Sequence, residues 1–322
     1  KRWLALLQGV GRVVDMSDSE HSHTDHGLTD GGMVERMRQA AVSEILNGGW
    51  IQTCRWVEEI DSTNAAMGRA VQSPNPPSLP ALLVADRQTS GRGRGDHRWY
   101  SPSGCLMCTL AVDGDMLPGD PRQLTQMALV VGVAVAETAE RFVPPSIVSL
   151  KWPNDLYVKD RKCGGILIES VSGTRQRLQH FNLVGNASRP PASSTGARSN
   201  TTWMIGIGIN ASVDWENAPR GLEDTATSLS AHTPRPVEVA DVLIELTARL
   251  ARRLDAWSKS DSDWLPQWQQ RCLLSGRTIT ARSFAGESIS GKCEGIDNMG
   301  RLLIRTVRGV QPVQSAEILH WS

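Results

Sequence analysis

Residues 91–104 constrain this chain more than any other stretch, because they place a short cationic, glycine-rich loop between two apolar runs. The runs 81–85 and 105–112 predict two buried strands on either side of the loop. Glycine has no Cβ, so the loop can bend tightly and bring backbone N–H groups close to a ligand, while Arg92 and Arg94 supply positive charge. The stretch therefore predicts an anion-binding loop at a strand end.

Composition confines any basic site to a local patch. The 322 residues carry 34 Lys and Arg against 34 Asp and Glu, so the formal net charge is zero. A charge excess of the kind that marks binding to nucleic acid or anionic membrane is missing, and neither is expected as a partner. The length exceeds that of a typical single domain and favours one large domain with a smaller one.

Six cysteines are scattered along the chain, and a chain of this length does not need disulfides to fold. Cys105 and Cys108 form a Cys-x-x-Cys pair inside a predicted strand, where positions i and i+3 point to opposite faces, so we expect core thiols. No apolar run reaches the length of a membrane span, and the first residues lack a sustained secretory signal. These features predict a reducing, cytoplasmic location.

Residues 1–32 are polar and lack sustained hydrophobic periodicity, which predicts a disordered tail. Its histidines at 21, 23 and 26 have no neighbours that would fix a metal geometry. Residues 33–46 have apolar residues at helical spacing, and two glycines follow. One helix and a polar tail are too little for a DNA-binding domain.

A cluster of polar residues follows the next predicted strand, residues 54–60. Ser62, Thr63 and Asn64 stand directly before a predicted helix, so they can serve simply as its N-cap. Alternatively, their hydroxyl and amide groups bind a small polar ligand at a strand-to-helix turn. The residues by themselves leave both interpretations open.

Residues 148–169 predict strand, turn, strand, turn, strand. A Pro-Asn-Asp turn brings Asn154 and Asp155 close to Lys151, and Lys162 stands at the mouth of the last strand. Ordinary hairpin chemistry is one explanation. A nucleotide with a divalent cation would also need such a set, namely lysines, an arginine loop and an Asp/Asn pair at neighbouring strand ends.

The remaining pattern predicts a large α+β domain followed by a small β domain. Helices are expected at 122–142, 236–257 and 264–274, a flexible insertion at 172–202, and a buried strand at 203–210 that ends on Asn210. From residue 277 the pattern changes to strand periodicity with regular glycines, which fits a miniature barrel. The predicted parts are a tail (1–32), a catalytic domain (33–275) and a C-terminal β domain (276–322).

Five motifs occur in the order found in the biotin protein ligases, or holocarboxylase synthetases, and resemble them closely. They are Ser62-Thr-Asn64, Gly91-Arg-Gly-Arg94 with Trp99-Tyr-Ser-Pro102, Lys151-Trp-Pro-Asn-Asp155, Lys162-Cys-Gly-Gly-Ile-Leu167 and Gly206-Ile-Gly-Ile-Asn210. The resemblance implies a mixed β-sheet flanked by helices, as in class II aminoacyl-tRNA synthetases, and a small SH3-like β-barrel at the C-terminus. It also implies two steps, in which biotin and Mg·ATP form biotinyl-5′-adenylate and a carrier lysine then takes the biotinyl group.

The same resemblance assigns roles to individual residues. Those expected at biotin or its adenylate are Ser62, Thr63, Asn64, Gln88, Arg92, Gly93, Arg94 and Lys162, and those expected around the nucleotide are Gly91, Lys151, Asn154, Asp155 and Asn210. Arg94 and Lys162 are the expected catalytic residues, because negative charge gathers around the α-phosphate, and Asp155 is the candidate for Mg²⁺. The implied partners are biotin, ATP and the biotin carboxyl carrier protein of acetyl-CoA carboxylase or a similar carboxylase, with the protein a monomer or a homodimer.

Asp96 departs from the family pattern, in which further Arg and Gly residues commonly follow the position of Arg94. Its carboxylate could hold Arg92 or Arg98 in place, or weaken phosphate binding. A lipoate or octanoate ligase would share the fold, although the Gly-Arg loop together with Lys-Trp-Pro-Asn-Asp favours biotin. A biotin-sensing regulator without a DNA-binding domain is a second alternative, whereas the loop is too short for an RGG-type RNA-binding segment.

Overall fold

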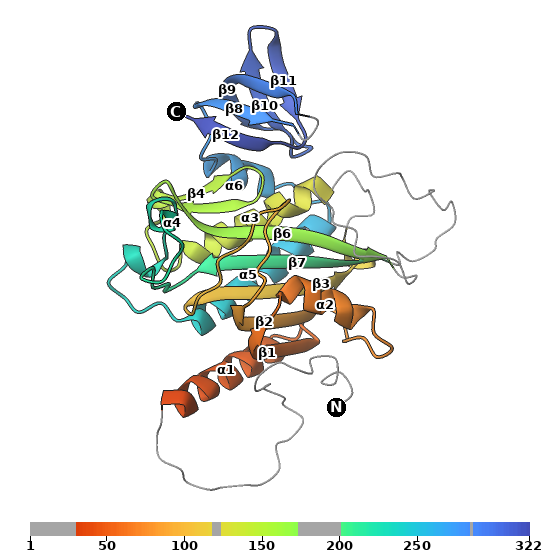
Figure 1. Ribbon diagram of the computed structural model, residues 1–322. Coiled ribbons are helices and arrows are strands. Elements are labelled where there is room, and N and C mark those ends of the chain that lie inside the picture. Colours follow the sequence, from red (N-terminus) through yellow and green to blue (C-terminus); the bar gives the residue numbers. More distant parts are fainter. Residues whose placement is uncertain (1–29, 118–123, 173–200, 284–285) are drawn as a thin grey trace, which may run out of the picture.

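A computed structural model of the protein describes residues 30–117, 124–172, 201–283 and 286–322. Figure 1 shows a larger body of helices and strands with a smaller β-sheet at the C-terminal end. The fold is of the mixed α+β class, as the sequence predicts. In these ranges no helix combines the length and the apolar character that crossing a membrane requires.

The larger body is built on a seven-stranded mixed sheet. Its strands are β1 (Thr53–Ile60), β2 (Ala81–Gln88), β3 (Cys105–Asp113), β4 (Val148–Lys151), β5 (Asp155–Val158), β6 (Arg161–Ser172) and β7 (Thr201–Asn210). They lie in the order β1-β2-β3-β7-β6-β5-β4, and only the β1–β2 pair is parallel. The strand–turn–strand prediction for residues 148–169 is confirmed by β4, β5 and β6.

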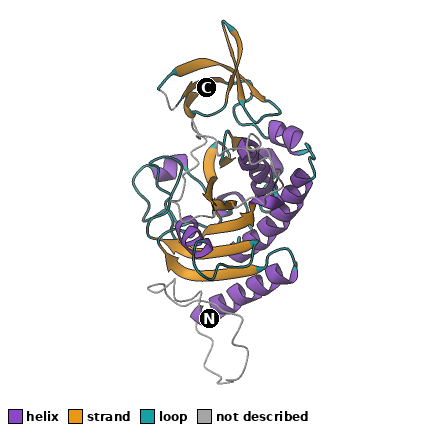
Figure 2. Cartoon of the chain, turned by 90° about the vertical axis from the view of Figure 1, so that its right-hand side faces the viewer, coloured by secondary structure: helices purple, strands orange, loops and turns teal. Residues whose placement is uncertain are grey.

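Helices cover both faces of this sheet. They are α1 (Asp30–Asn47), α2 (Thr63–Val71), α3 (Leu124–Ala139), α4 (Leu222–Thr225), α5 (Val239–Ser258) and α6 (Trp264–Gln270), with 3₁₀ turns at Gly114–Met116, Pro145–Ile147 and Ser230–His232. Alternate residues of β2 point to opposite sides: Leu82 packs with α3 and α5, whereas Leu83 packs with α2. Most of the helices gather along one side of the strands in Figure 2.

The C-terminal region forms a separate five-stranded antiparallel sheet. Its strands are β8 (Thr278–Arg282), β9 (Ser288–Ile296), β10 (Leu302–Thr306), β11 (Gly309–Val313) and β12 (Glu317–Trp321). They pair in the order β11-β10-β9-β8-β12, so β11 and β12 are the two edges and strand pairing does not close the sheet. The predicted strands are present, while closure into a barrel stays a prediction.

The two sheets are joined by hydrogen bonds to one turn of the C-terminal region. The indole Nε1 of Trp152 donates to the carbonyl of Gly300 at 3.0 Å, and Gln126 Nε2 of α3 donates to the carbonyl of Asn298 at 2.6 Å. Trp152 is fully buried and Gly300 has φ 78°, in the left-handed region that glycine adopts readily. The docking fixes the start of β12 beside the larger sheet.

Three predicted segments differ from the structure or lie partly outside the described residues. Helix α1 begins at Asp30, so residues 30–32 belong to a helix and not to the tail, whereas residues 1–29 lie outside the described residues. Most of the insertion predicted at 172–202 also lies outside them, because β6 ends at Ser172 and β7 starts at Thr201. The helix predicted at 122–142 is described as α3 and ends at Ala139, while residues 122 and 123 lie outside the described residues.

Candidate active site

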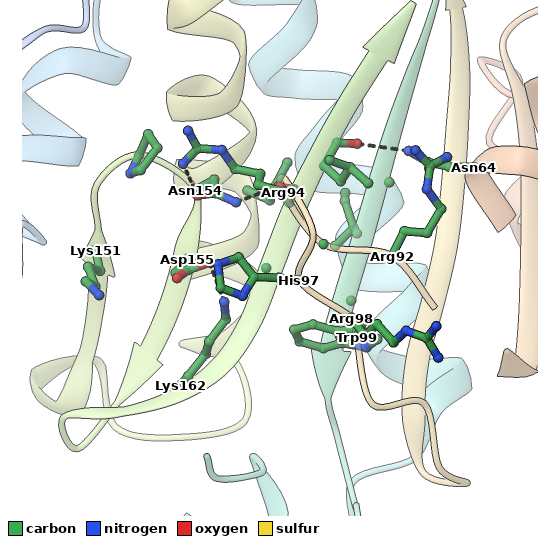
Figure 3. A pocket seen from close by; sticks show the side chains of 18 of the residues that line it. Asn64, Arg92, Arg94, His97, Arg98, Trp99, Lys151, Asn154, Asp155 and Lys162 are labelled. Atoms are coloured by element: carbon green, nitrogen blue, oxygen red, sulfur yellow. Dashed lines mark hydrogen bonds and ion pairs between the residues drawn. The ribbon is translucent and has the colours of Figure 1, made fainter. Parts of the chain in front are cut away.

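A cavity of about 340 Å³ lies where the glycine–arginine loop folds over β6 and β7. This volume suits a small-molecule ligand. Eleven of the predicted site residues line it: Ser62, Thr63, Asn64, Gln88, Arg92, Gly93, Arg94, Lys151, Asn154, Asp155 and Lys162. Figure 3 shows ten of its side chains with their labels. Residues that are far apart in sequence therefore form one polar site.

The glycine–arginine loop is a small hairpin. Gly93 N–H donates to the carbonyl of His97 at 2.8 Å, and Trp99 N–H donates to the carbonyl of Gly91 at 3.0 Å. Gly95 turns the chain with φ 59°. A Cβ on Gly91 would lie 2.4 Å from the carbonyl oxygen of Trp99, so only glycine fits there. Gly91 thus shapes the loop and does not itself line the cavity.

The cluster before α2 faces the cavity. Ser62 occupies the N-cap position, but its side chain makes no capping hydrogen bond. Gln88 Oε1, at the end of β2, accepts from the backbone N–H of Thr63 at 2.7 Å and from its hydroxyl at 3.2 Å. Of the two interpretations of this cluster, capping by the Ser62 side chain is wrong, and Ser62 and Thr63 instead line the site.

Arg94 is a half-buried cation with spare hydrogen-bonding capacity. Its Nη1 donates to Asn154 Oδ1 at 3.2 Å, whereas its Nη2 is buried and has no hydrogen-bond partner among the described residues. Burial lowers the pKa of Arg94, and the nearby carboxylates of Asp155 and Glu317 oppose that shift. A buried guanidinium nitrogen without a partner at a cavity wall is suited to an anionic ligand.

Lys162 Nζ and Asp155 Oδ1 form an ion pair at 2.7 Å in the cavity wall (Figure 3). The described residues contain no group of three or more His, Cys, Asp or Glu side chains that could hold a metal ion. Mg²⁺ is commonly bound through one or two carboxylates together with substrate phosphates. Asp155 supplies a carboxylate of this kind in the cavity wall.

Trp99 is a site residue that the sequence interpretation did not assign. A Cβ on Gly208 would lie 2.6 Å from Cε2 of its ring, and a Cβ on Gly206 would lie 2.3 Å from Asn64 Oδ1. The glycines of β7 make room for two side chains of the same chain, which the glycine spacing alone does not identify.

Lys151 connects the site to the C-terminal sheet. Its ammonium lies 4.0 Å from the centre of the Trp321 ring, and burial lowers the pKa of this lysine. The start of β12 also forms part of the cavity wall, through Ala316, Glu317 and Ile318. The sequence carries no motif for these residues, because their place depends on how the two sheets dock.

Asn210 is not among the residues that line the cavity, and its nucleotide role stays a prediction. Its side chain is buried and its Nδ2 donates to the carbonyl of Thr227 at 2.9 Å, so the amide binds a loop of the protein itself. Cys105 and Cys108 are buried free thiols, and burial raises the pKa of Cys105 to about 12. These thiols are therefore protonated at neutral pH, as the core interpretation requires.

A buried carboxylate, Glu169 on β6, lies behind the cavity wall and was also missed by sequence interpretation. It forms an ion pair with Arg92 at 2.8 Å, with 1% of its side chain exposed. Its sequence signal is a charged residue at the end of an apolar run, Gly-Ile-Leu-Ile-Glu. Asp96, in contrast, is exposed at the tip of the loop.

Two family models match separate parts of the chain. One family model, the Biotin/lipoate A/B protein ligase family, matches residues 56–185, and a second, the Biotin protein ligase C terminal domain, matches residues 274–321. The Bacillus spizizenii bifunctional ligase/repressor BirA is 30% identical over 239 residues, which cover 74% of this chain and 65% of that protein. The chain thus spans slightly less than two thirds of that relative.

Two further similarities extend over nearly the whole length of the matched protein. The biotin–(acetyl-CoA-carboxylase) ligase of Paracoccus denitrificans is 28% identical over 267 residues, covering 80% of this chain and 96% of that protein. A solved structure of the biotin protein ligase from Aquifex aeolicus in complex with biotin and ATP has a TM-score of 0.65 and 26% identity, and the match covers 84% of this chain and 99% of that one. The chain thus carries one region that matches the biotin/lipoate protein ligase family and a C-terminal region that matches the biotin protein ligases, and it is similar to biotin protein ligases over most of its length.

Proposed function

We propose that this protein is an ATP-dependent biotin–protein ligase that modifies a lysine of a biotin carboxyl carrier protein through biotinyl-5′-AMP. The observation that carries the proposal is Arg94, whose buried Nη2 has no partner in the described structure and belongs to the cavity that Lys162 also lines. Such a pair of cations can stabilise charge that builds up on a phosphate. The named activities of the Paracoccus and Aquifex proteins support the same substrates.

In the first step, an oxygen of the biotin carboxylate forms a bond to the α-phosphorus of ATP, and pyrophosphate leaves. Arg94 and Lys162 offset the charge of the two approaching anions, and Asn154 orients the Arg94 guanidinium through its 3.2 Å hydrogen bond. Asp155 is the residue that would hold Mg²⁺, whose chemistry is to neutralise phosphate charge. Lys162, once released from Asp155, is free to bind the phosphate.

In the second step, the uncharged amine of the acceptor lysine attacks the acyl carbon of the mixed anhydride, and AMP leaves. The anhydride reacts readily with water, so the glycine–arginine loop and Trp99 over the cavity would serve to exclude solvent. Ser62, Thr63, Gln88 and Gly93 are the groups proposed to hold the biotin end, and Lys151 is placed nearer the nucleotide.

The proposal extends to the organisation of the molecule. The catalytic domain is residues 33–275, and residues 276–322 form an SH3-like barrel. The free thiols support a reducing, cytoplasmic location, and the acceptor is the carrier of acetyl-CoA carboxylase or of a similar carboxylase.

Incubation of the purified protein with labelled biotin, ATP, Mg²⁺ and an apo carrier domain tests the function directly. We expect biotin-dependent exchange of pyrophosphate into ATP and label on one carrier lysine. Absence of labelling, together with modification of a lipoyl domain by lipoate or octanoate, would establish the alternative ligase activity instead. An exposed variant on the C-terminal sheet, Arg305→Ala, serves as a control that should retain the activity of the wild type.

A further inference from the structure

Glu169 is a buried charge that the two proposed reaction steps do not use. It lies on β6, its side chain is 1% exposed, and it is not among the residues that line the cavity. A carboxylate is rarely fully buried unless cations or hydrogen-bond donors compensate it. The identity of its partners therefore indicates what the charge is for.

Both of its oxygens are occupied by donors from the substrate site. Oε1 accepts from Arg92 Nη2 at 2.8 Å, and Oε2 accepts from Asn64 Nδ2 at 2.9 Å. The Asn64 amide is oriented in turn, because Thr109 donates its hydroxyl to Oδ1 at 2.6 Å. A continuous chain of hydrogen bonds thus runs from β3 through α2 and β6 to the glycine–arginine loop.

We propose that Glu169 is a positioning residue that fixes Arg92 before any substrate binds. Through Arg92 it also fixes the first side of the glycine–arginine hairpin. Removal of Arg92 from this pair would leave a buried carboxylate without its cation, which is strongly unfavourable. Arg92 therefore holds its part of the loop in place. Arg94, whose Nη2 has no hydrogen-bond partner among the described residues, is the residue that responds to the ligand.

The inference rests on the proposed function, and it sets Glu169 apart from the residues that act on the phosphate. A preformed loop lowers the entropy that is lost when substrate binds. Substitution of Glu169 should therefore mainly weaken substrate affinity. Loss of Glu169 should raise KM for biotin while the adenylation step, which depends on Arg94 and Lys162, keeps most of its rate.

Glu169→Gln is the informative substitution, because it keeps the shape but puts one NH₂ against a donor of either Arg92 or Asn64. Without substrates, we expect trypsin to cleave the variant in the loop, after Arg92, Arg94 or Arg98, at least about fivefold faster than the wild type. In pyrophosphate exchange, we expect KM for biotin to rise about tenfold and kcat to change by less than about threefold. The exposed pair of Glu294 with Arg305 supplies the control, and Glu294→Gln should match the wild type in both assays.

A second set of variants covers the case in which Glu169→Gln folds poorly. Arg92→Lys keeps the charge and should give an intermediate KM, and the Arg92→Met/Glu169→Gln double variant should be no worse than the more affected single variant. Wild-type rates of loop cleavage in Glu169→Gln, a fall in kcat at unchanged KM, or multiplying effects in the double variant would each overturn the inference. A wild-type protein without biotin-dependent exchange would refute the proposed function, while the cleavage assay would still decide whether Glu169 holds the loop.

Discussion

Arg94 has an environment that ties its charge to a ligand. Arg94 is half-buried, and one terminal nitrogen donates to Asn154, while the other is buried and has no hydrogen-bond partner among the described residues. The protein thus buries one donor of this cation without compensation, which is typical of groups kept for a substrate.

Arg94→Ala should lower kcat for biotin-dependent pyrophosphate exchange by about 10²–10³-fold, because it removes a donor aimed at the developing phosphate charge. The melting temperature should hold or rise slightly, since the variant also removes a half-buried charge. Exchange kinetics with a parallel thermal melt check both expectations. A rate close to that of the wild type would remove Arg94 from the catalytic residues.

Gly208 is a second residue with a direct effect on the site. A methyl group there would lie 2.6 Å from the Trp99 ring, so Gly208→Ala must displace this side chain from β7. We expect a higher KM for biotin and a loss of about 1–3 kcal/mol in the free energy of unfolding. Gly31→Ala is the matched control, because nothing lies within 4 Å of its Cβ. Equal KM values in the two variants would show that Trp99 does not shape the site.

At the scale of elements, helices α3 and α5 are joined by a group of charges as well as by apolar packing. Glu137 of α3 is paired with Arg252 and Arg253 of α5, and Arg253 also binds Asp263 at 2.9 Å. Burial alone would raise the pKa of Glu137, but hydrogen bonds from Arg253 and Arg252 hold it below its ordinary value of 4.5.

Glu137→Gln should therefore destabilise the protein in a pH-dependent way. At neutral pH we expect a loss of about 1–3 kcal/mol, because two guanidinium groups lose a charged partner. The folded-state pKa lies below that of the unfolded chain, so the difference from the wild type persists above about pH 4.5 and shrinks as the pH falls through the lower folded value. Urea unfolding of both proteins over this range tests it, and a constant difference would contradict it.

Element types were predictable because they depend on local patterns. Alternating and apolar runs predicted β1, β2 and β3, and helical spacing predicted α5. The start of α1 was misplaced, because the glycines at 31 and 32 are unfavourable in helices and yet α1 continues through them to Asp30.

On the scale of the whole molecule, the docking of the C-terminal sheet completes the cavity wall. Trp152 belongs to the same motif as Asn154 and Asp155, and its indole binds the carbonyl of Gly300. Asn154 and Asp155 of this motif therefore face the cavity, while Trp152 binds the C-terminal sheet. This docking places Glu317 beside the site.

Trp152→Phe should weaken this docking, because the buried Gly300 carbonyl loses its donor. We expect a loss of about 1–3 kcal/mol in stability and a higher KM for ATP. Trp56→Phe is matched to it, since Trp56 is also buried and donates its Nε1 to Asp86 at 2.9 Å, inside the larger body. Trp56→Phe should lose stability but keep the wild-type KM for ATP. If both variants had the same KM for ATP, docking of the C-terminal sheet would have no role in ATP binding.

Residue chemistry at short spacing was enough to predict the family motifs, the main strand and helix types and eleven of the residues that line the cavity. Tertiary structure alone decided that Arg92 pairs with Glu169, 77 positions away, and that Trp99 fills the space left by Gly208. It also turned Asn210 to a loop carbonyl and brought β12 to the cavity. Such contacts join distant segments through sheet register and domain docking, which no local pattern encodes.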